Sequence, residues 1–420
     1  MNLKKLISSY GAGLSWAGVS ALAGKLKQPI RTGLAWANDT VPVRYLKKLL
    51  GAGRVWVAVS VIATLGIHSM GLFDLLNYKV LDFSYTNVRG PLAGWSARQP
   101  IDRDSLKVVL VEVDDESWRL VPFKWPYPRD EVWSRTIRNL TDAGARVIVF
   151  DIEFDTPDFK SDYLERLNQA GSNIPFRHGD EVLAEAIEYA HSKGTRVVLG
   201  AQMISETTRV PPQYIQQPVE RLMAVDPVLG LVNTIEDFDQ TYRKYALAFG
   251  MAHVQDTSYL PLAIKAVKEY RGIPDTTLLR PTGKPFEVGY GSAIIRTYGG
   301  TPSFIVNFYG PASGAPSPRQ DGKAWKTFDR YPLSNVLDDE SFDLREEDDD
   351  NDWMSMFDPD GEFNLMMQML DPTYEPPESP FKDKIVLIGV SVNVLLDVKN
   401  TPYYNYAGQQ QLMPGVEVHA

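Results

Sequence analysis

The segment Lys107–Val113 (KVVLVEV) is a run rich in β-branched residues, and it decides how the rest of the chain is interpreted. After it come a Pro-rich turn, a helix-like segment Asp130–Ala143 and a second apolar run, Arg146–Phe150 (RVIVF). Strand, helix and strand in this order are typical of a βαβ unit. The two runs therefore predict the start of an α/β fold.

The same alternation continues along the chain. Helices are predicted over Glu181–Lys193 and Leu260–Tyr270, and strands over Thr195–Gly200, Ser303–Phe308 and Lys384–Gly389. Nearly all-apolar strands are typical of sheets that are covered on both sides. We therefore expect a mostly parallel sheet with helices on both faces.

Composition and charge limit the classes of function. The chain has 420 residues, 44% of them hydrophobic, a net charge of −10 and no Cys, which excludes disulfides, Cys-ligated zinc and thiol catalysis. The first 100 residues carry a balance of +9, so the remainder carries −19. An acidic body repels phosphate, and nucleic acid is therefore not an expected partner.

One segment has the character of a membrane span. Val55–Phe73 contains 19 residues without a formal charge, which is about 28 Å of helix and close to bilayer thickness. Arg54 precedes it, and Trp56 lies near its start. We predict one transmembrane helix over residues 54–76, and the alternative is a buried helix of a soluble domain.

Flanking charges predict the orientation of this helix. Residues 1–54 hold nine Lys and Arg with Asp39 as their only acid, whereas residues 74–100 hold three basic residues and two acids. By the positive-inside rule, residues 1–53 form a basic cytoplasmic segment and residues 77–420 form an extracytoplasmic domain at the cell (inner) membrane. The weakly apolar stretch Tyr10–Gly24 is interpreted as an interfacial helix or as a disordered segment.

Three polar insertions are expected to be loops: Ile204–Val228, Gly310–Arg330 and Asp338–Pro380. The last contains ten acids and one Arg within residues 338–352. A calcium loop is one interpretation, but Trp353 and Pro359 stand where an EF-hand needs Gly and Glu. We therefore favour a solvated, mobile acidic loop.

Catalytic signatures are absent from the sequence. It contains no phosphate-binding glycine loop, no nucleophile elbow and no metalloprotease motif, and the five His show no metal-ligand spacing. No catalytic residue, metal or cofactor is therefore assigned. Carboxylates that follow the predicted strands remain as candidates for ligand binding: Asp114, Asp115, Glu116, Asp151, Glu153, Asp155 and Asp397.

Two interpretations of these acids stay open. The carboxyl ends of parallel strands form the usual ligand crevice of an open α/β sheet, so the acids can bind a ligand there. Asp at strand-to-helix junctions more often caps the following helix or fixes a turn.

Five segments in order resemble one known family. They are Val111–Trp118 with Trp125–Arg129 (WPYPR), Gly144–Asp158, Gly230–Tyr245, Val306–Pro311, and Lys384–Pro402 leading to Met413–Ala420. Together they resemble the type-two CHASE domain, the extracytoplasmic sensory module of bacterial nucleotide cyclases and of histidine and serine/threonine kinases. In the third segment Asp239 and Arg243 match the family's turn, while Gln240 replaces its usual Gly.

The resemblance implies a membrane-anchored sensory domain that acts as a homodimer or within a larger membrane complex. In the family, a segment like Met413–Ala420 leads to further membrane helices and a cytoplasmic output domain. This chain carries no such output domain, so it is expected not to be an enzyme. The alternatives are an assembly subunit of a membrane complex and, last, a metal-dependent hydrolase that uses Asp114, Asp115, Asp151 and Asp155.

The expected input site is a crevice at the ends of the first two strands. It combines the acids named above with Trp125 and Arg129, and the family turn adds Asp239 and Arg243 as further candidates. A flat aromatic wall beside carboxylates suits a small cationic or polyhydroxyl ligand. The alternative is a buried ion pair between Arg129 and Asp151 that holds the turn against the sheet.

Overall fold

A computed structural model describes residues 52–69, 72–89, 106–205, 214–251, 259–298, 302–316, 323–346, 349–406 and 408–420. The chain divides into two compact units, Met1–Val80 and Leu81–Ala420. The predictions for residues 1–51 lie outside the described part of the chain.

In the first unit the described structure begins with a helix, α4 (Ala52–Ser69). A second helix, α5 (Leu72–Phe83), crosses the boundary between the units. The predicted transmembrane helix over residues 54–76 is therefore divided between two helical elements. Within the described ranges, no helix has both the length and the apolar character needed to cross a bilayer.

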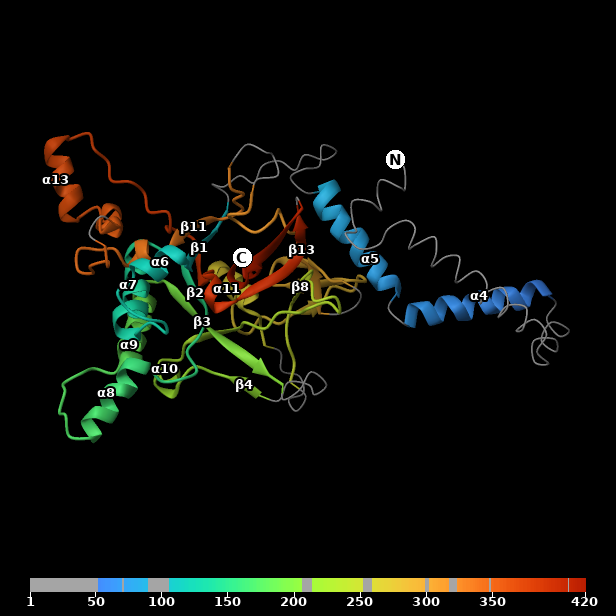
Figure 1. Cartoon of the computed structure of the whole chain (residues 1–420), viewed down its shortest axis with the longest axis horizontal. Coiled ribbons are helices and arrows are strands. Elements are labelled where there is room, and N and C mark those ends of the chain that lie inside the picture. Colours follow the sequence, from blue (N-terminus) through green and yellow to red (C-terminus); the bar gives the residue numbers. More distant parts are fainter. Residues whose placement is uncertain are drawn as a thin grey trace. The chain divides into compact units, whose positions relative to one another are not determined.

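The second unit is built on a mostly parallel sheet, as predicted (Figure 1). Six parallel strands lie in the order β11-β1-β12-β2-β3-β5, and β4 (Tyr214–Gln216) pairs antiparallel with β3. The parallel strands are β1 (Val108–Val113), β2 (Val147–Glu153), β3 (Arg196–Ile204), β5 (Val228–Leu231), β11 (Asp329–Pro332) and β12 (Ile385–Val390). Because β12 lies between β1 and β2, the first two strands are not neighbours.

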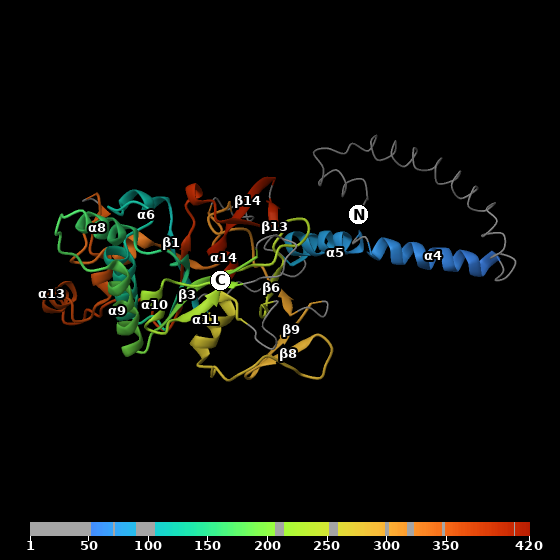
Figure 2. The same ribbon diagram turned by 90° about the horizontal axis from the view of Figure 1, so that it is seen from below.

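Helices cover both faces of this sheet. Alternate residues of each strand point to opposite sides, so Val111 and Phe150 face one core while Leu110 and Val149 face the other. The first core packs against α6 (Asp115–Leu120), α7 (Ser134–Asp142), α9 (Gly179–Ser192) and α12 (Leu333–Leu337). The second packs against α11 (Leu262–Arg271) and α14 (Gly415–His419) (Figure 2).

The predicted strand over Ser303–Phe308 forms in part but belongs elsewhere. It is the short strand β10 (Ser303–Ile305), which pairs antiparallel with β6 (Lys244–Ala246) outside the main sheet. Two more small sheets are present: β7 (Arg280–Pro281), β8 (Glu287–Tyr290) and β9 (Ala293–Arg296), and the hairpin of β13 (Val398–Tyr406) and β14 (Gln409–Pro414). The remaining elements are α8 (Phe159–Gln169), α10 (Glu220–Met223), η1 (Ser84–Arg89), η3 (Arg129–Trp133) and η6 (Asn393–Leu395).

The three insertions are not simply loops. The first contains β4 and α10, the second ends in β11, and the third contains η5 (Trp353–Phe357) and α13 (Glu362–Leu370). The acidic stretch is tied to the body, because Arg135 binds Asp339 at 2.9 Å and Arg119 binds Asp349 at 3.2 Å. Ion pairs with the helices of the first core therefore hold this stretch at several points.

Candidate functional site

A pocket of about 430 Å³ lies at the carboxyl ends of the parallel strands. Strand β2 supplies Asp151 and Glu153, and β3 supplies Gln202. Asp397 lies in the connection after β12, and Lys399 lies at the start of β13. The other lining residues are Trp125, Ile152, Val232, Val390, Leu395, Gly415 and His419. The pocket thus combines several ionisable groups with an apolar lining.

Asp151 is the most unusual group in this pocket. Its side chain is only 8% exposed, and its Oδ2 atom has no hydrogen-bond partner in the described part of the chain. Burial raises the pKa of Asp151, His419 opposes that rise, and Asp397 adds to it. An ionised carboxylate in this position is costly unless a cation or a donor reaches it.

The orientation of His419 follows from a chain of hydrogen bonds. The backbone N–H of Ala263 donates to Tyr245 Oη at 3.2 Å, so the hydroxyl proton is free to point at His419 Nδ1, 2.6 Å away. Nδ1 then accepts, and the ring proton lies on Nε2, which is 3.7 Å from Asp151 Oδ1. The ring therefore presents an N–H to the Oδ1 side of the Asp151 carboxylate, and the buried Oδ2 keeps no hydrogen-bond partner among the described residues.

The other charges in the pocket are unequally balanced. Lys399 lies 3.0 Å from Asp397, so these two charges offset each other. Glu153 is half-buried; burial raises its pKa, and the neighbouring Asp155 and Asp151 raise it further. Because Lys399 pairs with Asp397, its charge does not offset those of Asp151 and Glu153. The pocket therefore retains an excess of negative potential around these two carboxylates.

Helix α14 forms one wall of the pocket and packs closely against Asp397 and β12. A Cβ atom on Gly415 would lie 2.3 Å from Asp397 Oδ2, and one on Gly389 would lie 2.6 Å from Val416 Cβ. Two glycines thus permit the close approach of α14 to β12 and to Asp397. A shift of Asp397 or of β12 would therefore displace α14 directly.

The structure brings together four of the candidate residues named from the sequence: Trp125, Asp151, Glu153 and Asp397. Trp125 packs edge-on against Tyr127 and Trp133, which fixes its ring at the pocket wall. Sequence reasoning did not select Gln202, Lys399, Gly415 or His419. The last three lie in segments that carry the family resemblance, and that was the only signal available for them.

The acids that follow β1 lie outside this pocket. Asp114 caps α6, since its carboxylate accepts the backbone N–H of Ser117 at 2.8 Å. Asp115 and Glu116 are exposed in the first turn of that helix. Asp155, after β2, accepts a hydrogen bond from Gln216. Helix capping is therefore observed for Asp114 alone among these acids, and none of the four lines the pocket.

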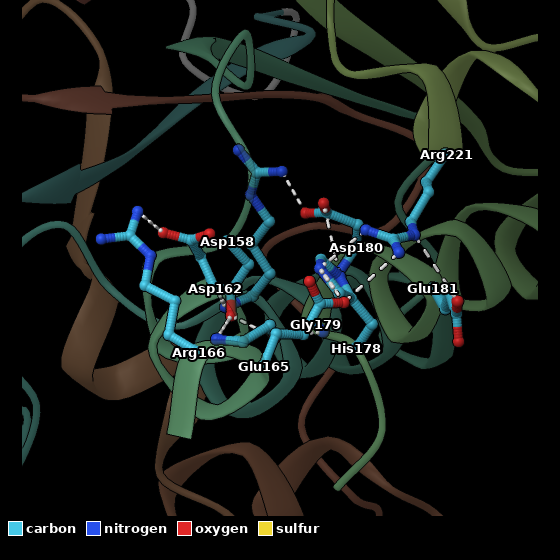
Figure 3. Close-up of polar contacts among 11 residues, drawn as sticks. Asp158, Asp162, Glu165, Arg166, His178, Gly179, Asp180, Glu181 and Arg221 are labelled. Atoms are coloured by element: carbon cyan, nitrogen blue, oxygen red, sulfur yellow. Dashed lines mark hydrogen bonds and ion pairs between the residues drawn. The ribbon is translucent and has the colours of Figure 1, made fainter. Parts of the chain in front are cut away.

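Arg129 is buried away from the pocket, and its ion-pair partner is Asp180, not Asp151. Its guanidinium also donates to the carbonyl of Thr156, and its backbone N–H donates to Asp158 at 2.9 Å. Figure 3 shows the surrounding cluster, in which Arg221 contacts His178 Nε2 at 2.8 Å. These contacts join η3 to the starts of α8 and α9, so the sequence prediction of this pair named the wrong acid.

Asp239 and Arg243 form a third polar cluster, also outside the pocket. Arg243 is fully buried and binds both carboxylate oxygens of Asp239, at 2.7 and 2.9 Å. It also binds both oxygens of Asp82, at 2.7 and 2.8 Å, and reaches Asp237 at 3.1 Å. Gln240 has φ of 60°, the left-handed conformation that the family's usual Gly adopts readily. The predicted turn therefore forms despite the substitution.

The acidic stretch holds a group of carboxylates within 4.8 Å of one another: Asp338, Asp350 and Asp352. Asp338 already accepts the backbone N–H groups of Asn351, Asp352 and Trp353 at 3.0 to 3.3 Å. Burial raises the pKa of Asp338 to about 6. These contacts describe a carboxylate that fixes a loop, and we assign no cation to it.

Comparison with known proteins gives one match. A family model described as the CHASE2 domain matches residues 57–420. No curated protein and no solved structure matches the chain. The matched region contains every residue that lines the pocket, and the match confirms the resemblance found in the sequence.

Proposed function

Because this chain belongs to the CHASE2 domain family, whose members are extracellular sensory domains of signalling receptors, we propose that it is the sensory part of a membrane-anchored receptor. The anchor is the apolar segment Val55–Phe73, and residues 77–420 are exported. The excess of Lys and Arg before residue 55 supports a cytoplasmic N-terminus. Signalling through the membrane would involve a homodimer or a larger complex.

Limited proteolysis tests this topology. Protease added to intact spheroplasts is expected to degrade the large domain, because residues 77–420 are exposed outside, and to leave a tag at the N-terminus intact. Immunoblots against tags at both ends read out the result. Digestion of the N-terminal tag with protection of the large domain would reverse the topology and remove the sensory proposal.

We place the input site at the pocket between β2, β12 and α14. The observation that carries this proposal is the buried residue Asp151, which lines a pocket of about 430 Å³ and whose Oδ2 atom lacks a partner among the described residues. A protein rarely keeps such a group without a use for it. Occupancy of the pocket would then displace or draw in α14, which carries Gly415 and His419.

The chemistry of the lining favours a small organic cation. An ammonium group can satisfy Asp151 and Glu153 together, and an apolar body can rest against Trp125. The charge of Lys399 does not oppose this, because Asp397 offsets it. A polyhydroxyl ligand satisfies the same oxygens but leaves the negative potential unbalanced, so the cation is the better fit.

Calorimetric titration with 2-phenylethylamine tests the ligand class, with 2-phenylethanol as its neutral counterpart. The amine is expected to bind and the alcohol is not, and Asp151→Asn should weaken amine binding at least tenfold. Binding should strengthen as pH rises through the raised pKa of Asp151, because the carboxylate must be ionised. Asp115→Asn, outside the pocket, is the matched control and should bind normally.

Equal binding of amine and alcohol, or no binding of either, would refute the cationic ligand. A second measurement separates pocket chemistry from misfolding. Asp151→Asn should raise the melting temperature at neutral pH, since it removes a buried charge that the fold disfavours. That gain should vanish as pH falls through the raised pKa of Asp151, because the wild-type carboxyl is then neutral too.

A further inference from the structure

Helix α13 (Glu362–Leu370) presents an apolar surface to solvent. Met369 is 83% exposed and Leu370 is 74% exposed, and the rest of this surface is Phe363, Leu365 and Met366. Figures 1 and 2 both place α13 at the edge of the second unit. Five large apolar side chains gathered on one short helix are unusual for a surface that contacts only water.

The polar and apolar sides of α13 are reversed relative to an ordinary surface helix. The side chain that faces the body is polar: Asn364 is fully buried and donates to the carbonyls of Met356 and Asp358 at 2.9 and 2.7 Å. Its Oδ1 atom accepts the hydroxyl of Tyr374 at 2.8 Å. In an amphipathic helix the apolar stripe normally faces the core. Here a satisfied polar anchor faces inward, and the apolar side is directed outward.

The support beneath α13 is well packed. Asn364 binds η5 and the residue that follows it. The ring centroid of Trp353 in η5 lies 5.5 Å from that of Tyr331, in a tilted contact, and 6.2 Å from that of Phe381, in an edge-to-face contact. Phe381 is fully buried in the first core. The apolar surface is therefore presented by an element that is anchored to the sheet.

Charge around this surface has one sign. The sequence contains no Lys or Arg between Glu346 and Phe381. Glu362 is exposed in the first turn of α13, and exposed acids flank the helix on both sides: Asp360, Asp371 and Glu375. An apolar stripe bordered by carboxylates is complementary to a helix with an apolar stripe bordered by Lys and Arg. The same carboxylates would repel each other across a contact between two copies of α13.

We infer that α13 is a docking surface for a basic amphipathic helix of a partner protein. Methionine side chains are flexible and polarisable, so Met366 and Met369 can adapt to the apolar residues of such a helix. The acidic rim would orient the partner and speed its association. This function goes beyond ligand sensing, because it uses a surface that shares no residue with the pocket.

Fluorescence anisotropy with a labelled amphipathic peptide of about 18 Leu and Lys residues tests this inference. The whole chain is reconstituted in nanodiscs of neutral lipid, and empty nanodiscs provide the background. The basic peptide should bind, and raising the salt concentration should weaken binding because the acidic rim is exposed. The same peptide with Glu in place of Lys should bind at least tenfold more weakly.

A variant with Met369→Gln and Leu370→Gln should lose at least tenfold in affinity for the basic peptide. Both side chains are exposed, so the fold should be unaffected. Phe159→Gln, an equally exposed apolar residue on α8, is the matched control and should bind like the wild type. Unchanged binding to the α13 variant, or equal binding of the acidic peptide, would overturn the inference. So would a wild-type dimer that this variant dissociates, since a second copy would then cover α13.

Discussion

Replacing Arg243 with Gln is expected to destabilise the folded protein by about 3–5 kcal/mol. The guanidinium is fully buried and lies within hydrogen-bond distance of three carboxylates, those of Asp82, Asp237 and Asp239. Gln removes the positive charge and leaves Lys244, 2.7 Å from Asp237, as the neighbouring cation. Without the guanidinium the three carboxylates repel each other, and the buried Asp237 cannot regain its hydration. Urea unfolding of both proteins measures the loss.

Arg166→Gln is the matched control for this experiment. Arg166 pairs with Asp162 on the surface of α8, and its side chain is 74% exposed. A surface pair of this kind contributes about 0–1 kcal/mol, so this variant should unfold close to the wild type. If Arg243→Gln also stayed within about 1 kcal/mol of the wild type, the cluster would not be a structural anchor, and its role would need to be reconsidered.

The second large effect is expected for Arg129→Gln, which should also cost about 3–5 kcal/mol. Asp180, only 1% exposed, would lose its buried cation, and the carbonyl of Thr156 would lose a donor. The guanidinium also lies over the ring of Phe154, 5.0 Å from its centroid. Thermal and urea unfolding should both show the loss, whereas affinity for the amine in the remaining folded protein should not change.

A double-mutant cycle with Asp180→Asn isolates the ion pair from the other contacts of Arg129. The double variant should be less destabilised than the sum of the two single variants, because no unpaired buried charge remains. Additive losses would show that the pair itself contributes nothing. Loss of amine binding in the folded fraction of Arg129→Gln would instead indicate that Arg129 contributes to the ligand site, as expected from the sequence.

The central sheet could be predicted from local sequence because its middle strands are compatible with few structures other than buried strands. Val108–Val113, Val147–Glu153 and Ile385–Val390 are apolar on nearly every residue, and such runs are stable only between two covered faces. Gly144 and Gly194 directly follow the C-cap residues of α7 and α9 and adopt φ of 83° and 90°, the left-handed conformation that commonly ends a helix at this position.

The edge strands could not be predicted in this way. Val228–Leu231 (VLGL) is only four residues long, and Asp329–Pro332 (DRYP) contains two charges and a Pro. Both become strands because they pair with β3 and β1, which are far from them in sequence. Strand formation at a sheet edge depends on the partner more than on intrinsic propensity.

By itself, the sequence determined the family, the α/β class and the capping role that is open to Asp114. Only the tertiary structure decided which acids share a pocket. The insertion of β12 between β1 and β2 separates the ends of the first two strands by two strand spacings, about 9–10 Å, so Asp114 and Asp151 do not converge. Asp151 meets Lys399 and His419 instead, more than 240 residues further along the chain. Local residue patterns carry no information about such contacts, because the order of strands is set by how the whole sheet buries its two faces.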